Sequence, residues 1–258
     1  MIWGSDGVRK RVNPGILEVT GLYKYFGGLA AVAGVDLCLE KGEIMGLIGP
    51  NGSGKTTVFN LIAGVFKPDQ GTIRLDGEDI THASPAAVCQ KGIGRTFQIP
   101  QPFSRLTVLE NVRLGRAYGS RPAGSIKEAE READEILEFI GLKPKRSVVS
   151  GRLPLLDRKR LELGKALATR PKVLLLDEIL GGLTPAEIDT AMDLILAIRD
   201  SGVTLVVVEH VMKAIMGISD RVIVLNSGAK IAEGPPKKVV LDPKVIEAYL
   251  GVDQHAKG

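Results

Sequence analysis

The stretch that most constrains this chain reads Gly49-Pro50-Asn51-Gly52-Ser53-Gly54-Lys55-Thr56. Its spacing is G-x-x-x-x-G-K-S/T, which is typical of a loop whose backbone N–H groups surround a phosphate chain. The glycines permit tight turns and a close approach of the backbone to phosphate oxygens. In this pattern Lys55 can reach the β- and γ-phosphates, and the Thr56 hydroxyl can ligate Mg²⁺.

The segments on both sides of this loop have the character that the pattern requires. Residues 43–48 read as a buried strand, and residues 57–63 can form a helix. The positive end of that helix would face the phosphates. An ordinary strand-turn-helix connection is the alternative, but the full context of strand, loop and helix favours a nucleotide-binding site.

Length and composition argue against several classes of protein. The chain has 258 residues, enough for one large α/β domain or for a core with a smaller subdomain. Its formal net charge of +4 is too slight to indicate nucleic acid as the main ligand. Cys38 and Cys89 belong to no CxxC pair, so zinc and disulfide sites are weakly supported. No apolar run approaches the ~18 residues of a membrane span.

Two neighbouring carboxylates follow a second apolar run. Residues 173–176 are all apolar, which fits a strand buried on both faces, and Asp177 and Glu178 come directly after them. Open α/β sheets bind ligands at the carboxyl ends of their strands. There Asp177 can hold Mg²⁺ through water opposite Thr56, and Glu178 can orient or deprotonate an attacking water. An ordinary strand that ends in acidic residues is the alternative.

Two further polar residues follow predicted strands. Gln98 comes after residues 93–97, and its amide could coordinate Mg²⁺ and contact the water. His210 comes after residues 203–208 and could donate a hydrogen bond to the γ-phosphate. Taken alone, a surface glutamine and a histidine satisfied by its neighbours are the default interpretations.

The remaining segments predict an α/β fold with two additions to the phosphate-loop core. Expected strands at 16–20 and 31–40 indicate an antiparallel β portion near the N-terminus. Helix-like segments dominate residues 98–156, which we interpret as an inserted helical subdomain. The expected boundaries are 1–15 for a flexible tail, 16–251 for the folded domain and 252–258 for a second tail.

The order of these motifs resembles that of an ABC-transporter nucleotide-binding subunit, from about residue 17 to residue 250. Several stretches look like the ATPase subunits of branched-chain amino acid importers in particular. These are FGGLAAV at 26–32, GRTFQ at 94–98, LTVLENV at 106–112, VEHVM at 208–212 and DPKVIEAYLG at 242–251.

The resemblance implies a P-loop ABC ATPase that binds ATP and Mg²⁺ and hydrolyses ATP to drive transport. It makes Phe26 the aromatic that stacks on adenine, with Tyr25 as the alternative, because stacking needs a flat apolar face. The implied nucleotide-binding residues are Phe26, Gly49, Pro50, Asn51, Gly52, Ser53, Gly54, Lys55, Thr56 and Thr57. The implied catalytic residues are Lys55, Gln98, Glu178 and His210, and the implied metal ligands are Thr56, Gln98 and Asp177.

The resemblance also implies partners and a location. The partners would be a second ATPase subunit, two membrane permease subunits and, indirectly, a periplasmic or extracellular solute-binding protein, with no nucleic acid. The location would be peripheral, on the cytoplasmic face of the membrane. Gln101, Phe103 and Arg105 are expected to contact the permeases, although a solvated loop is the alternative. Another transport system, for urea or lipopolysaccharide, or a nucleic-acid-associated ABC ATPase remains an alternative function.

The chain departs from the family where members carry the signature LSGGQ. It reads Leu153-Pro154-Leu155-Leu156-Asp157 there. Pro154 has neither hydroxyl nor N–H, and the two leucines add bulk where glycine allows contact with the γ-phosphate of the partner's nucleotide. We expect the helix that follows this segment to form. The segment itself would be a degenerate signature that has lost much of its contact with the phosphate. The resemblance therefore implies a heterodimer with a partner that carries a full signature.

A second departure follows the two carboxylates. Residues 179–184 replace a proline-containing stretch that ends in aspartate in the family. Thr184, which stands in place of that aspartate, is expected to cap the helix that starts at Pro185.

Overall fold

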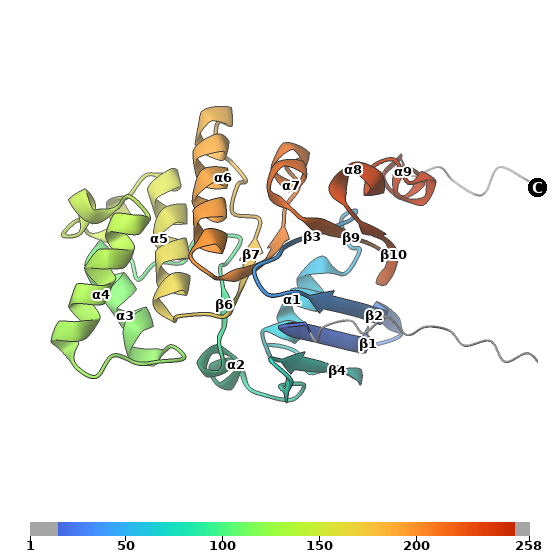
Figure 1. The fold of residues 1–258 in the computed structure, drawn as a ribbon, viewed down its shortest axis with the longest axis horizontal. Coiled ribbons are helices and arrows are strands. Elements are labelled where there is room, and N and C mark those ends of the chain that lie inside the picture. The colour runs from blue at the N-terminus through green and yellow to red at the C-terminus, as the bar shows by residue number, and fades with distance from the viewer. Residues whose placement is uncertain (1–14, 251–258) are drawn as a thin grey trace, which may run out of the picture.

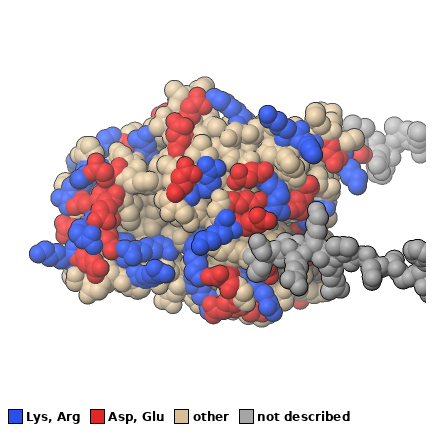
Figure 2. All heavy atoms as spheres, in the orientation of Figure 1, with Lys and Arg blue, Asp and Glu red and all other residues tan. Residues whose placement is uncertain are grey.

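The computed structural model describes residues 15–250. The two expected tails lie outside the described residues apart from Gly15, which is buried and donates its N–H to the Glu18 carboxylate. Cys38 and Cys89 are both free and partly buried. None of the helices in the described part of the chain is both long and apolar enough to cross a lipid bilayer. Acidic and basic side chains are interspersed over the face shown in Figure 2.

The expected antiparallel β portion is present as a four-stranded sheet in the order β2-β1-β4-β5. The strands are β1 (Leu17–Phe26), β2 (Leu29–Leu39), β4 (Gln70–Leu75) and β5 (Glu78–Asp79). β1 runs further than predicted, because Gly27, at a φ of 59°, allows a tight hairpin turn directly after Phe26.

The second sheet has six strands in the order β10-β9-β3-β8-β7-β6. The first five in chain order, β3, β6, β7, β8 and β9, are parallel, and β10 returns antiparallel to β9. Their bounds are β3 (Ile44–Ile48), β6 (Ile93–Arg95), β7 (Val173–Asp177), β8 (Thr204–Val208), β9 (Arg221–Asn226) and β10 (Ala229–Gly234). Every residue of β3, β7 and β8 is buried, as their nearly unbroken apolar runs predict for strands covered on both faces.

Helices cover both faces of the parallel sheet (Figure 1). Helix α1 (Lys55–Ile62) lies between the two sheets, where Val58 and Phe59 join one apolar core. On the opposite face α5 (Leu155–Ala168), α6 (Pro185–Asp200) and α7 (Met212–Ile218) form a second core. The short helices α2 (Pro85–Lys91), α8 (Pro236–Val239) and α9 (Pro243–Leu250) complete this part. The sequence pattern did not predict α7, which is too short to show a clear helical period.

A helical block forms one end of the molecule (Figure 1). It consists of α3 (Val108–Tyr118) and α4 (Ile126–Phe139), packed with α5 around a third apolar core that includes Val112 and Leu161. Because α5 contributes to this core and to the core under the parallel sheet, it links the block to the strands.

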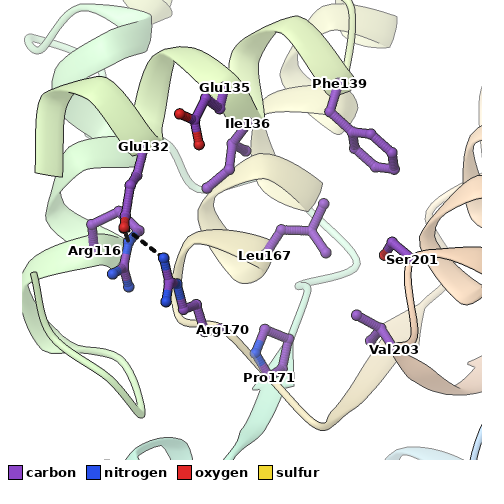
Figure 3. Close-up of a pocket in the computed structure, with 10 residues that line it drawn as sticks. All are labelled: Arg116, Glu132, Glu135, Ile136, Phe139, Leu167, Arg170, Pro171, Ser201 and Val203. Atoms are coloured by element: carbon purple, nitrogen blue, oxygen red, sulfur yellow. Dashed lines mark hydrogen bonds and ion pairs between the residues drawn. The ribbon is translucent and has the colours of Figure 1, made fainter. Parts of the chain in front are cut away.

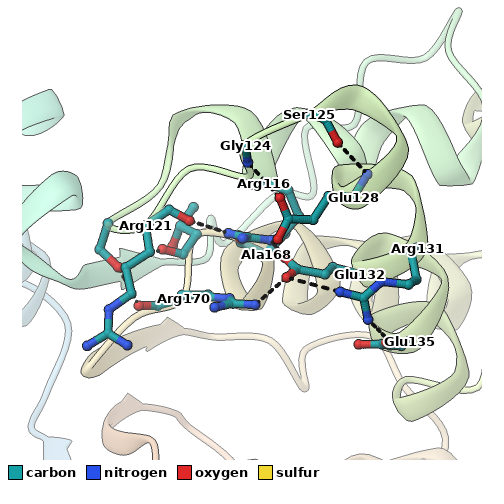
Figure 4. A network of polar contacts seen from close by, with 12 residues as sticks. Arg116, Arg121, Gly124, Ser125, Glu128, Arg131, Glu132, Glu135, Ala168 and Arg170 are labelled. Atoms are coloured by element: carbon teal, nitrogen blue, oxygen red, sulfur yellow. Dashed lines mark hydrogen bonds and ion pairs between the residues drawn. The ribbon is translucent and has the colours of Figure 1, made fainter.

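A buried charge network strengthens this link (Figure 4). The Arg116 side chain is 2% exposed and donates through Nε to Glu132 of α4. Its Nη1 donates to the carbonyl oxygens of Arg121, at 3.0 Å, and Ala168, at 3.2 Å. Arg170 reaches the same carboxylate at 2.5 Å from the connection between α5 and β7. The guanidinium of Arg116 thus joins α3, α4 and the end of α5.

Replacing Arg116 by Leu should lower the free energy of unfolding by about 3 kcal/mol, because it removes one partner of a buried ion pair and unpairs two carbonyls. Arg131→Ala is the matched control: Arg131 is exposed and approaches the same Glu132 at 3.8 Å. It should cost at most about 1 kcal/mol. Urea titration followed by circular dichroism measures both, and equal losses in the two variants would contradict this view of the network.

Candidate active site

The phosphate loop connects β3 to α1 in a conformation that only glycine adopts easily. Gly49, Gly52 and Gly54 have φ values of 152°, 77° and 102°. A Cβ on Gly49 would lie 2.1 Å from the Leu225 carbonyl oxygen, and one on Gly54 would lie 2.5 Å from that of Ala31. Glycine is therefore required for both dihedral angle and space.

Backbone hydrogen bonds hold the loop against both sheets. The Gly228 N–H donates to the Ser53 carbonyl oxygen at 3.1 Å, and the Ala33 N–H donates to the Gly228 carbonyl oxygen at 2.8 Å. A hollow opens beside the loop. It is lined by Leu29, Ala30, Ala31, Gly52, Ser53, Gly54, Lys55, Thr56, Thr57, Ser227 and Gly228.

The charge in this hollow suits an anion. The buried Lys55 ammonium donates to the carbonyl oxygens of Gly49, at 2.8 Å, and Pro50, at 2.9 Å. Burial lowers the pKa of Lys55, and the charges of Glu178 and Asp177 oppose that shift. The free N–H groups at the start of α1 add positive partial charge. A glycine cradle, an ammonium and a helix N-terminus together fit a phosphate chain.

The expected metal ligands are all of a type that suits Mg²⁺. Thr56, Gln98 and Asp177 offer a hydroxyl, an amide and a carboxylate oxygen. Among the described residues no group of three or more His, Cys, Asp or Glu side chains could hold a metal ion. Mg²⁺ at nucleotide sites usually combines one or two protein ligands with phosphate oxygens and waters, so a bound nucleotide would supply part of the coordination.

Asp177 and Glu178 lie at the carboxyl end of β7, as predicted. Asp177 is buried, and Arg95 Nη2 donates to its Oδ2 at 3.0 Å. Glu178 has a φ of 47°, a left-handed conformation that costs a residue with a side chain about 1–3 kcal/mol. Its N–H donates to the Val208 carbonyl oxygen at 2.9 Å, so the turn after β7 is fixed to the neighbouring strand.

The Glu178 carboxylate is held by Gln98 and His210, which were predicted for the same site but not in contact with Glu178. Gln98 Nε2 donates to Oε2 at 2.5 Å, and His210 Nε2 lies 2.8 Å from Oε1. Glu178 is only partly exposed, with 21% of its side chain accessible. Two residues from two other strand ends thus hold the Glu178 carboxylate, in a position that would allow it to accept a proton from a water molecule.

A second buried carboxylate lies behind this group. Glu209 accepts a hydrogen bond from the Leu180 N–H at 2.7 Å, and burial raises its pKa. Lys159 of α5 is also buried, which lowers its pKa, and its Nζ lies 3.5 Å from the Glu178 carbonyl oxygen. These contacts fix the segment after Glu178 to the residue before His210 and to α5.

The aromatic residues expected to stack on adenine lie at the end of β1. Phe26 is 46% exposed and packs edge-to-face on Phe66 with 5.3 Å between ring centroids. Its register partner is Leu29, which lines the hollow beside the phosphate loop. Tyr25 is also exposed and stacks on Tyr23. The adenine-stacking role of Phe26 stays a prediction.

Three residues of the site were not predicted. Arg95 pairs with Asp177, and its other arm reaches Asn60 of α1. The Tyr249 side chain of α9 lies beside the Gly49 backbone at the start of the phosphate loop. Arg95 and Tyr249 both occur in stretches that resemble the family, but no local pattern indicates their long-range contacts.

The degenerate signature segment forms an ordinary helix start. Pro154 occupies the N-cap position of α5 and contributes no side-chain cap. Leu155 is 44% exposed and lies beside Gly182. A Cβ added to Gly182 would be 3.2 Å from Leu155 Cδ2. Thr184 caps α6 as predicted, in a reciprocal capping box with Glu187.

A separate hollow lies between the helical block and the parallel sheet (Figure 3). Its lining residues are Arg116, Glu132, Glu135, Ile136, Phe139, Leu167, Arg170, Pro171, Ser201 and Val203. None of them is among the predicted site residues, so the candidate site is the region of the phosphate loop and the strand ends.

Comparison with known families agrees with this location. Residues 32–181 match the family described as ABC transporter. Residues 229–255 match the family described as branched-chain amino acid ATP-binding cassette transporter. The first match includes the phosphate loop and both carboxylates.

Individual relatives and structures are similar over nearly the whole chain. The high-affinity branched-chain amino acid transport ATP-binding protein BraF of Pseudomonas aeruginosa is 41% identical over 92% of this chain and 98% of its own. LivG of Escherichia coli, which carries the same description, is 39% identical over 92% of this chain and 98% of its own. The crystal structure of the ADP conformation of an ABC-transporter cassette has a TM-score of 0.84 at 36% identity, covering 92% of this chain and 98% of that one. The crystal structure of a nucleotide-free cassette from an ABC transporter has a TM-score of 0.82 at 35% identity, covering 91% of this chain and 98% of that one.

Proposed function

The chain belongs to the ABC transporter family of ATP-binding proteins, and we propose that it powers the uptake of branched-chain amino acids. Support for the solute comes from the matched segment at residues 229–255 and from BraF and LivG, which are branched-chain amino acid transport ATP-binding proteins. The observation that carries ATP hydrolysis is the Glu178 carboxylate, held by Gln98 and His210 at the strand ends beside the phosphate loop.

The chain's own residues account for most of the proposed mechanism. The loop N–H groups and Lys55 would hold the phosphates, with Lys55 leaving the loop carbonyls it contacts now. Glu178 would orient the attacking water and accept its proton, and His210 would contact the γ-phosphate. Because Gln98 and His210 hold the Glu178 carboxylate in the structure, that group is oriented before the reaction. Thr56, Gln98 and Asp177 would hold Mg²⁺, which neutralises charge on the phosphate oxygens when bound.

Glu178→Gln should lower ATP turnover about 100-fold or more, because an amide cannot accept the proton, while leaving ATP affinity within about twofold. The control is Glu135→Gln, which removes an exposed carboxylate from α4. Single-turnover hydrolysis and equilibrium binding of a fluorescent ATP analogue separate the two effects. Full hydrolysis by Glu178→Gln would remove Glu178 from the role of base.

We further propose that the working unit is a heterodimer with a second ATPase subunit. In such a dimer each nucleotide would lie between the phosphate loop of one subunit and the signature of the other. This chain has a full set of phosphate-loop residues, but Pro154 offers no hydroxyl and Leu155 adds an exposed apolar side chain beside Gly182. A homodimer would therefore contain two incomplete sites, and a partner with a full signature would complete the site on this chain.

A variant with Pro154→Ser, Leu155→Gly and Leu156→Gly should raise the ATPase rate of the isolated chain by at least about tenfold, because it restores phosphate hydrogen-bond donors. Leu241→Gly, which removes an exposed leucine of α8's C-terminal flank, is the control and should change nothing. Steady-state phosphate release measures both. An unchanged rate in a triple variant that folds and binds ATP would count against the signature as the missing part.

A groove between α2, α3 and α5 is the proposed docking site for a permease subunit. It is lined by Val65, Phe97, Phe103 and Tyr118, each of which is at least 47% exposed. Of the three residues expected to contact the permeases, Phe103 lines this groove. Because the groove begins next to Gln98, a helix seated in it would sense changes at the site. With a permease docked in this groove, the subunit would lie peripherally on the cytoplasmic face of the membrane, and a solute-binding protein would act on the other side.

Phe103→Asp should weaken association with the permease subunits by at least about tenfold, as loss of an aromatic anchor does at other interfaces. The Phe103 backbone bonds to Asn111 do not involve the ring, so the fold should survive. Ile126→Asp is the matched control, since Ile126 is 75% exposed but lies in α4 outside the groove. Co-purification with the permeases gives the readout, and full retention of Phe103→Asp would place docking elsewhere.

A further inference from the structure

Arg95 connects two parts of the site that the motifs treat separately. It is the last residue of β6, three positions before Gln98. Its Nη1 donates to Asn60 Oδ1 at 2.6 Å, and its Nη2 donates to Asp177 Oδ2 at 3.0 Å. Asn60 belongs to α1, five residues after Lys55. The guanidinium therefore spans the distance from the helix that follows the phosphate loop to the carboxyl end of β7.

The bridge is held rigidly. The side chains of Arg95 and Asp177 are 14% and 5% exposed, so little water competes for either group. The guanidinium also lies 5.7 Å from the centre of the Phe97 ring. Arg95 Nε is buried and has no hydrogen-bond partner, so the two Nη groups alone carry the polar contacts.

This geometry matters for a metal because Mg²⁺ requires near-ideal octahedral geometry. A carboxylate on a free side chain can rotate, whereas one fixed by a charge-assisted hydrogen bond presents its second oxygen in one direction. Arg95 donates to Oδ2 of Asp177, so the other carboxylate oxygen, Oδ1, is the one that would face a metal ion. Its contact with Asn60 fixes that carboxylate relative to α1, the helix that also carries Thr56.

We propose that Arg95 is a positioning residue for the metal site, which fixes Asp177 relative to Thr56 so that Mg²⁺ binds tightly. The proposal rests on the Mg²⁺-dependent ATPase proposed above. Arg95 would have two opposite effects on the affinity for Mg²⁺, one through its charge and one through the bridge. The positive charge of Arg95 repels Mg²⁺, so charge alone would make removal of Arg95 tighten metal binding, whereas loss of the bridge would weaken it.

Arg95→Lys isolates the bridge from the charge. Lysine keeps the positive charge, but one ammonium on a flexible stem does not reproduce the planar two-armed contact. The experiment measures binding of a fluorescent ATP analogue to the full chain, first in EDTA and then over a titration with Mg²⁺. We expect affinity in EDTA to stay within about twofold and the Mg²⁺ concentration for half-saturation to rise about tenfold, the usual cost of losing such an outer contact.

Two further variants keep the test decisive. Asn60→Ala removes the other end of the bridge without touching Asp177, so it should shift the Mg²⁺ requirement in the same direction by a smaller factor. It also carries the test if Arg95→Lys does not fold. Arg199→Lys, at a pair with Asp200 on the surface of α6, is the matched control and should have no effect.

The possible outcomes separate this inference from the proposed function. An unchanged or lowered Mg²⁺ requirement in Arg95→Lys overturns the positioning role, and so does an equal loss of affinity in EDTA, which would indicate general support of the loop. If binding and turnover by the unaltered chain do not depend on Mg²⁺ at all, the proposed metal chemistry fails and the inference fails with it.

Discussion

The phosphate loop and the catalytic candidates depend on the parallel alignment of β3, β8, β7 and β6. Hydrogen bonds between strands set their register, with Asp177 beside Val208. Because parallel strands end at one edge of the sheet, the segments that follow them meet there. The phosphate loop follows β3, Glu178 follows β7, and Gln98 and His210 follow β6 and β8. A shift in register by one residue would turn buried side chains to the other face, so core and site are specified together.

This dependence explains which features could be predicted from the sequence. Short stretches of the sequence are enough to predict the phosphate loop, the buried strands and the polar residues at their ends. The parallel sheet then brings these residues together. The contacts of Arg95 with Asn60 and of Tyr249 with the phosphate loop join segments that are distant in the chain, so no local pattern reveals them. The left-handed backbone of Glu178 was also not predictable, because the residue type disfavours it and its neighbours impose it.

The proposed composite site would be complete on one side only. Lys55 and the Glu178 group are in place, while the degenerate signature of the same chain has an exposed Leu155 beside Gly182 and no hydrogen-bonding side chain at Pro154. The helix that carries this segment is nonetheless well packed in two cores, so the altered segment leaves the fold intact. In the proposed dimer the change would affect only contact with the partner's nucleotide. Such an asymmetry is physically consistent with a subunit that uses one half of a composite site and relies on another chain for the other half.

The most direct test of this asymmetry is the steady-state ATPase rate of the purified chain, alone and after addition of each ATPase subunit encoded beside its gene. A low rate alone that rises strongly with one partner is the predicted result, since only that partner supplies the missing signature. A high rate for the chain alone would contradict it, because residues 153–157 would then serve as a working signature despite their lost phosphate contacts.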